Sequence, residues 1–166
     1  MTIGFGAPGG LPIVGDWAGR KMATIGVYQP TTAQWFVRHG HEPGPADDEF
    51  SFGLAGAERL VVVGDWDGDG KANVGLYEPS TSSWHLRGGS PDGREDVSYF
   101  FGPPGGLPVA GDWNGDGRDS IGVYMPDWGL WILRDENTNG PADHVVAHRI
   151  DGSRPLVGDF SSISRE

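Results

Sequence analysis

Apolar and polar residues alternate along the chain in short runs separated by turns rich in glycine and proline. One run begins at Leu60, passes through an acidic loop at 65–70, and is followed by a second apolar run at 73–77. Alternation with a period of two between turn signals is typical of β-strands, and no segment shows the longer period of a useful helix. The pattern therefore predicts an all-β chain in which pairs of strands flank acidic loops.

The same pattern occurs repeatedly. A Gly-Asp-aromatic sequence begins at Gly15, Gly64, Gly111 and Gly158, so the copies lie 47 to 49 residues apart. Repetition at such a period is the sequence sign of a repeat architecture. The predicted strands are 11–17, 24–28, a segment around Trp35 and 49–52; 60–66, 73–77, a segment around Trp84 and 97–101; and 107–113, 120–124, a segment around Trp131 and 144–148.

Four short strands per repeat predict β-propeller blades, which normally form rings of about 4–8. We expect one repeat domain over 1–166, with blades at about 7–53, 54–102 and 103–150, and strands of partial blades within 1–6 and 151–166. Three blades are too few for a usual ring, and an isolated arc would expose two apolar end faces. Three solutions stay open: a homo-oligomer, most simply a dimer that completes the ring; a piece of a longer array; or an unusually small closed ring.

The acidic loop of the second repeat predicts a metal site. Asp65, Asp67 and Asp69 occupy alternate positions, and alternate residues of a tight loop can turn their side chains toward one centre. Carboxylates that close repel one another unless a cation lies between them. Ca²⁺ takes about 6 to 8 oxygen ligands from carboxylates, amides and backbone carbonyls, so Asn73 and the carbonyl of Lys71 complete the predicted set.

These motifs resemble the FG-GAP-like, or VCBS-type, repeats of bacterial secreted and surface proteins, which are related to the calcium-loop blades of integrin α-subunit propellers. The resemblance rests on the Phe-Gly pairs at Phe52 and Phe101, the loop at 63–70 and the following strand at 74–79, and it covers nearly the whole chain. It implies that the acidic loops bind Ca²⁺, and that the propeller serves adhesion or ligand binding, outside the cell or on its surface, rather than catalysis.

The resemblance extends the calcium prediction to the third repeat. The implied ligands there are Asp112, Asn114, Asp116, the carbonyl of Arg118 and Ser120. Because two carboxylates replace three, we expect weaker binding at this loop.

The other two copies depart from the pattern. Ala18 and Arg20 replace ligands in the first copy, where we expect an ion pair between Arg20 and Asp16 instead of a metal. The fourth copy keeps only Asp159 and Ser161.

Repeated aromatic and basic residues have a structural interpretation. We interpret Trp35, Trp84 and Trp131 as packing between blades rather than as platforms for sugar rings. The arginines that end the same strands, Arg38, Arg87 and Arg134, are interpreted as members of structural ion pairs. Trp128 lies outside the repeat register, and is therefore the candidate for an exposed ligand contact.

Composition excludes several classes of function. The net charge of −11 opposes binding to nucleic acid and to anionic lipid. The chain has no cysteine, and therefore no disulfide or thiolate zinc site. No apolar run reaches the roughly 18 residues of a membrane span, and residues 1–6 do not have the pattern of a signal peptide. No catalytic motif is present, so we expect no enzyme.

The leading hypothesis is a calcium-binding, non-enzymatic propeller module for adhesion, ligand binding or scaffolding of a protein or glycan partner. The variable loops 39–48, 88–95 and 135–143 would form its contact surface, because loops on a rigid scaffold are free to vary. One alternative is a carbohydrate-binding lectin with aromatic pockets between blades. The other is a designed or excised repeat array whose only property is self-assembly.

Overall fold

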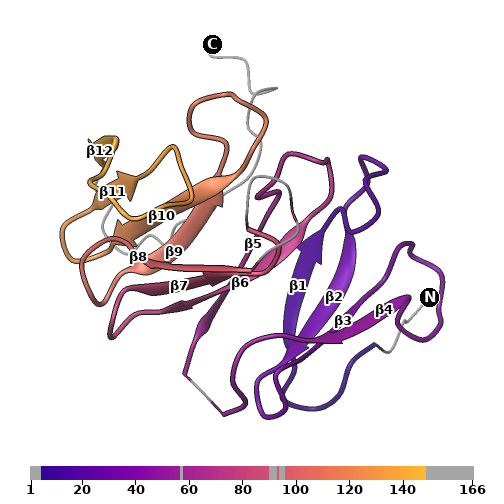
Figure 1. The fold of residues 1–166 in the computed structure, drawn as a ribbon. Coiled ribbons are helices and arrows are strands. Elements are labelled where there is room, and N and C mark those ends of the chain that lie inside the picture. The colour runs from indigo at the N-terminus through magenta and orange to yellow at the C-terminus, as the bar shows by residue number, and fades with distance from the viewer. Residues whose placement is uncertain (1–4, 57, 90–92, 94–95, 149–166) are drawn as a thin grey trace.

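The computed structural model describes residues 5–56, 58–89, 93 and 96–148. Within these residues the chain forms twelve β-strands and no helix, in three separate four-stranded sheets (Figure 1). Sheet 1 comprises β1 (Leu11–Gly15), β2 (Thr24–Gln29), β3 (Gln34–Val37) and β4 (Asp48–Ser51); sheet 2 comprises β5 (Leu60–Gly64), β6 (Asn73–Glu78), β7 (Ser83–Leu86) and β8 (Val97–Phe100); and sheet 3 comprises β9 (Leu107–Gly111), β10 (Ser120–Met125), β11 (Leu130–Leu133) and β12 (His144–Ala147). The all-β, four-strand repeat is therefore confirmed, while the described sheets form no closed ring.

Each sheet is an antiparallel meander in which neighbours in sequence are neighbours in the sheet. The register repeats as well: Tyr28, Tyr77 and Tyr124 on the second strands lie opposite the repeated tryptophans of the third strands. The first strands end at Gly15, Gly64 and Gly111, earlier than predicted, because the Asp and Trp that follow already belong to the loops.

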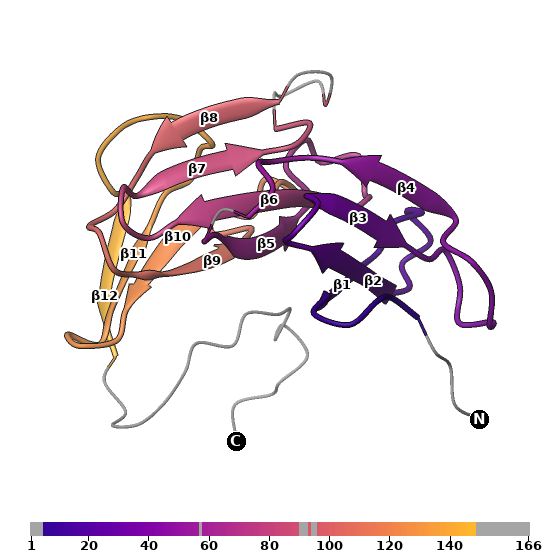
Figure 2. The same cartoon turned by 90° about the horizontal axis from the view of Figure 1, so that it is seen from below.

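The core lies between sheets, and each sheet has two chemically different faces. The tryptophan face carries Trp35, Trp84 or Trp131, and the aliphatic face is the opposite one. The tryptophan face of sheet 1 packs on the aliphatic face of sheet 2 in one apolar cluster, and the tryptophan face of sheet 2 packs on the aliphatic face of sheet 3 in a second cluster. The three sheets are consequently arranged side by side, with the middle first strand, β5, in contact with both β1 and β9 (Figure 2).

The repeated tryptophans confirm the packing interpretation in sheets 1 and 2. Trp35 and Trp84 are 0% exposed. Their indole N–H groups donate to the carbonyls of Phe52 and Phe101 at 3.0 and 3.1 Å. A large aromatic side chain with its polar atom satisfied contributes strongly to a core, so these residues anchor the contacts between sheets and are inaccessible to a sugar.

The strands predicted for partial repeats fall almost entirely outside the described residues. Phe5 and Gly6 lie outside any strand, and the remaining residues of those predictions, 1–4 and 151–166, fall outside the described residues. Among the residues that are described, there is no helix with the length and apolarity needed to cross a membrane.

Candidate metal centre

The loop between β5 and β6 is folded around the carboxylate of Asp65. Its Oδ1 accepts the N–H groups of Gly68 and Asp69 at 2.8 and 3.1 Å, and its Oδ2 accepts the N–H of Gly70 at 2.8 Å. Gly68 and Gly70 have φ values of 74° and 84°, in a region that glycine enters without a steric penalty. The Asp-Gly alternation in the sequence is thus what allows this tight turn.

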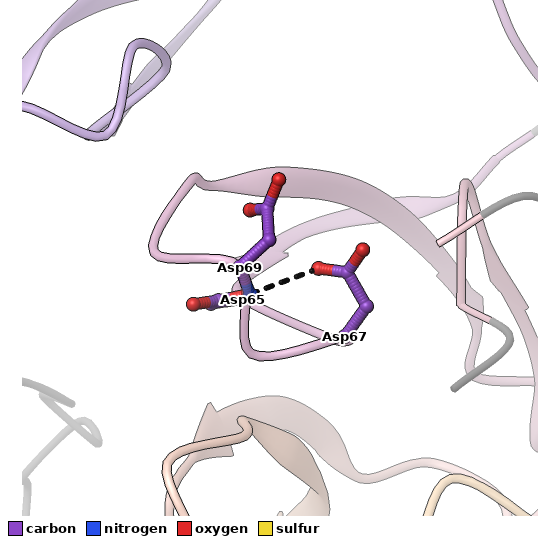
Figure 3. Close-up of side chains that lie close together, drawn as sticks. All are labelled: Asp65, Asp67 and Asp69. Carbon is purple, nitrogen blue, oxygen red and sulfur yellow. Dashed lines mark hydrogen bonds between the residues drawn. The ribbon is translucent and has the colours of Figure 1, made fainter. Parts of the chain in front are cut away.

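The same turn brings three carboxylates together (Figure 3). Asp65, Asp67 and Asp69 can each offer one oxygen such that the three oxygens lie within 4.8 Å of one another, a group that could hold a metal ion. We call it the three-carboxylate group. Among the described residues, one basic group forms an ion pair with this cluster: the Nζ of Lys71 lies 3.1 Å from a carboxylate oxygen of Asp69.

The electrostatic environment of this group differs from that of the first loop. Burial raises the pKa of Asp65, and the neighbouring Asp67 raises it further, against the opposing effect of the N–H donors. In the first loop, burial would also raise the pKa of Asp16, but the backbone N–H groups of residues such as Arg20 and Lys21 hold it below its usual value. Negative charge is therefore unfavourable at Asp65 in a way that a bound cation would relieve.

The remaining predicted ligands of the second loop lie beside the carboxylates, and one of them makes a hydrogen bond within the loop. Lys71 and Asn73 line a polar cleft of about 240 Å³ between sheets 1 and 2, together with Asp67 and Asp69. The side-chain oxygen of Asn73 accepts the N–H of Trp66 at 3.3 Å. Asn73 therefore holds the start of the loop in this structure.

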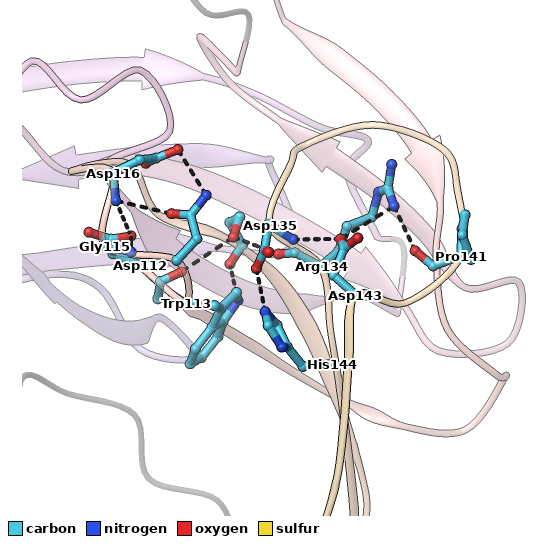
Figure 4. A network of polar contacts seen from close by, with 12 residues as sticks. Asp112, Trp113, Gly115, Asp116, Arg134, Asp135, Pro141, Asp143 and His144 are labelled. Atoms are coloured by element: carbon cyan, nitrogen blue, oxygen red, sulfur yellow. Dashed lines mark hydrogen bonds and ion pairs between the residues drawn. The ribbon is translucent and has the colours of Figure 1, made fainter.

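The loop between β9 and β10 repeats the turn of the second loop (Figure 4). Asp112 accepts the N–H groups of Gly115, Asp116 and Gly117 at 2.7, 3.1 and 2.9 Å. Asn114 stands where the second loop has Asp67, and its amide donates to Asp116 at 3.1 Å. The scaffold of a metal loop is thus present, with one carboxylate fewer.

Of the last two predicted ligands of this loop, Ser120 directs its hydroxyl to the backbone, and Arg118 lies in the turn itself. The hydroxyl of Ser120 is buried and donates to the carbonyl of Arg134 at 2.6 Å, as Thr24 does to the carbonyl of Arg38 at 2.5 Å in sheet 1. The N–H of Arg118 donates to Asp116 at 2.9 Å. The structure therefore brings Asp112, Asn114 and Asp116 together and directs the Ser120 side chain into the sheet.

The first loop corrects one prediction. Asp16 accepts the backbone N–H groups of Arg20 and Lys21 at 2.9 and 2.5 Å, and the Arg20 guanidinium donates to the carbonyl of His39 at 3.4 Å. The expected ion pair between Arg20 and Asp16 is wrong, because backbone donors already satisfy the carboxylate and the arginine reaches the adjacent loop.

Asp119 is a site residue that the sequence reasoning missed. Its carboxylate accepts the N–H of Asp65 at 2.8 Å, while its own N–H donates to the carbonyl of Asp65 at 2.7 Å. The latter bond has a counterpart in sheets 1 and 2, where Ala72 donates to the carbonyl of Asp16 at 2.8 Å. The position before Asn73 and Ser120 thus links the loop of its own repeat to the loop of the preceding repeat. Burial raises the pKa of Asp119 at this position.

The variable loops beside the metal loops are braced by the repeated arginines. Arg38 donates to the carbonyl of Glu42 at 2.7 Å and pairs with Asp47 at 3.2 Å. Arg134 similarly donates to the carbonyl of Pro141 at 2.6 Å and lies 3.5 Å from Asp143 (Figure 4). The ion-pair interpretation is confirmed for these two residues, which hold loops 39–48 and 135–143 in shape.

Trp128 lies in the turn between β10 and β11 and is 58% exposed. It is therefore accessible to a ligand, in contrast to Trp35 and Trp84.

Comparisons of the chain with models of protein families, with curated proteins and with solved structures found no match. The resemblance to FG-GAP-like repeats accordingly stays a prediction from the motifs.

Proposed function

We propose that this chain is a calcium-binding, non-enzymatic β-propeller module whose rim loops bind a protein or glycan in adhesion or scaffolding outside the cell. The observation that carries the calcium part is the three-carboxylate group: Asp65, Asp67 and Asp69 converge within 4.8 Å on a loop that backbone donors hold in place. Hard oxygen ligands of this kind suit Ca²⁺ better than softer metals, which favour nitrogen and sulfur.

The role of the metal in this proposal is to stabilise the rim. A ligand that binds only the folded state stabilises it by RT ln(1 + [L]/Kd), about 2.7 kcal/mol when free ligand is a hundredfold above Kd. The chain has no disulfide, so calcium would supply a cross-link between residues that otherwise repel one another. The adjacent loops 39–48 and 135–143, which Arg38 and Arg134 brace, then present a fixed surface to a partner.

Isothermal calorimetry with calcium tests the proposal. We expect a site in the wild-type chain whose affinity falls toward that of the third loop in Asp67→Asn, a change that removes one charge, keeps the side-chain shape and copies the residue found at Asn114. Asp127→Asn, an exposed aspartate outside the loops, is the matched control and should leave binding unchanged. Absence of calcium binding by the wild-type chain at millimolar concentration would end the metal proposal.

Carbohydrate binding is the second candidate, and one observation favours it. A cleft of about 510 Å³ between sheets 2 and 3 is lined by polar side chains that include Arg118, Asp135 and Asn137. Because Trp84 is buried, sugar stacking in this cleft cannot use the repeated tryptophan. Glycan-array binding that disappears in Asn137→Ala would select this candidate, and binding that depends on Trp128 would place the glycan at the exposed turn.

A further inference from the structure

Two faces of the described sheets are left without a neighbour, one at each end of the row. These are the tryptophan face of sheet 3 and the aliphatic face of sheet 1. Val146 on the first is 49% exposed, whereas Tyr99, its counterpart in sheet 2, is 4% exposed. Val14 on the second is 61% exposed, whereas its counterpart Ala110 in sheet 3 is 9% exposed.

The other residues of these two faces show the same difference. Trp131 is partly exposed, whereas Trp35 and Trp84 are completely buried. Ile25 is partly exposed, whereas its counterparts Val74 and Ile121 are buried. Apolar side chains that are core residues in two repeats are therefore accessible in the third, as expected for a contact surface whose partner is another molecule.

The chain itself shows what fits these faces. A tryptophan face packs on an aliphatic face twice, between sheets 1 and 2 and between sheets 2 and 3. Both contacts also contain one equivalent backbone hydrogen bond, from Ala72 to the carbonyl of Asp16 and from Asp119 to the carbonyl of Asp65. Continuing the repeat assigns the next bond to an N–H from Ala23 and the carbonyl of Asp112, and neither group bonds to another described residue.

We propose that the tryptophan face of sheet 3 binds the aliphatic face of sheet 1 of a second copy of this chain, and that two copies close a ring through two such contacts. The proposal rests on the propeller part of the proposed function. A contact between different faces generates either a closed ring or an open filament. Two copies bring six described sheets, within the range of about 4–8 blades for propellers, whereas three copies would exceed it.

Light scattering tests the proposal on the full chain. We expect a mass of twice the 17.7 kDa chain for the wild type. Val14→Asp and Val146→Asp should each return the mass of one chain, because a carboxylate buried at the contact without a partner weakens dimerisation by about a hundredfold or more. Phe100→Asp is the control: Phe100 is 64% exposed on sheet 2, away from both end faces, and its variant should stay dimeric.

Hydrogen exchange of the Ala23 amide gives an independent readout. The amide should exchange more slowly in the dimer than in monomeric Val146→Asp, whereas an interface elsewhere would leave its rate unchanged. A monomeric wild type, or a dimer that survives both end-face substitutions, would overturn the proposal. If the wild type is monomeric, an increase in the exposure of Trp131 to a fluorescence quencher in Leu156→Asp would assign the tryptophan face of sheet 3 to the fourth sequence copy of the same chain instead.

Calcium calorimetry on the same samples separates this inference from the proposed function. A monomer that binds calcium contradicts only the dimer. A dimer that binds no calcium contradicts only the metal centre.

Discussion

Removal of the Asp119 carboxylate should destabilise the link between the second and third loops. In Asp119→Ala the N–H of Asp65 loses an acceptor at 2.8 Å in a partly buried position. A buried donor left without a partner costs about 1–3 kcal/mol. For a chain of 166 residues, each kcal/mol corresponds to roughly 2–4 °C in Tm, so the expected loss is roughly 2–12 °C.

Asp119→Asn is the matched variant, since its amide oxygen can still accept the same N–H. Burial raises the pKa of Asp119, which means that the charge itself is unfavourable there. The asparagine variant should therefore lie within about 1 kcal/mol of the wild type and clearly above the alanine variant. Thermal unfolding followed by circular dichroism, with chelator present to exclude metal binding, measures both. Equal losses in the two variants, or no loss in the alanine variant, would refute the reasoning.

Three further predictions concern the third loop, a buried tryptophan and a partly buried histidine. Asn114→Asp gives the third loop a third carboxylate and should raise its calcium affinity in calorimetry, because ligand charge tunes affinity; an unchanged affinity would exclude this loop as a metal site. In urea unfolding, Trp84→Ala should lower the free energy of unfolding by about 3–5 kcal/mol because a buried aromatic side chain is lost. Trp128→Ala should change it by no more than about 0.5 kcal/mol. Equal losses in the two variants would contradict the packing described. Burial, followed by the charge of Arg59, lowers the pKa of His85 below its ordinary value. The contribution of neutral His85 to the free energy of unfolding is therefore complete above that ordinary value and is lost as pH falls through the folded pKa. In unfolding experiments between about pH 7 and 5, His85→Gln should therefore lose less stability than the wild type.

The sequence was sufficient to predict the strands and the aspartate loops because both depend on local pattern. Alternation and glycine placement set β5, the following turn and β6 within the chain segment itself. The tryptophan interpretation also held for Trp35 and Trp84, because a large apolar residue at equivalent positions of several repeats is most simply a core residue.

Side-chain partners that lie far apart in sequence could not be predicted in the same way. The bond between Asp119 and Asp65 joins two repeats and depends on how adjacent sheets pack. Ser120 sits at a ligand position by sequence, but the strand register brings the Arg134 carbonyl within reach of its hydroxyl. Arg20 was expected to neutralise Asp16, yet backbone N–H groups of the turn occupy that carboxylate first.

A departure from the repeat pattern is the one sequence signal that could have identified Asp119 as a site residue. Asp119 replaces the alanines found at Ala23 and Ala72, so a carboxylate appears at one copy of an otherwise apolar position. A polar residue that breaks an apolar repeat position is a sensible candidate for a contact between repeats.

The most direct test of the central claim is a crystal structure of the chain grown with calcium, with anomalous scattering used to locate the ion. The account predicts an anomalous peak coordinated by oxygens of Asp65, Asp67 and Asp69, at calcium–oxygen distances of about 2.3–2.6 Å. Water alone among these three carboxylates at millimolar calcium, in a crystal whose β5–β6 loop is otherwise folded as described, would contradict it.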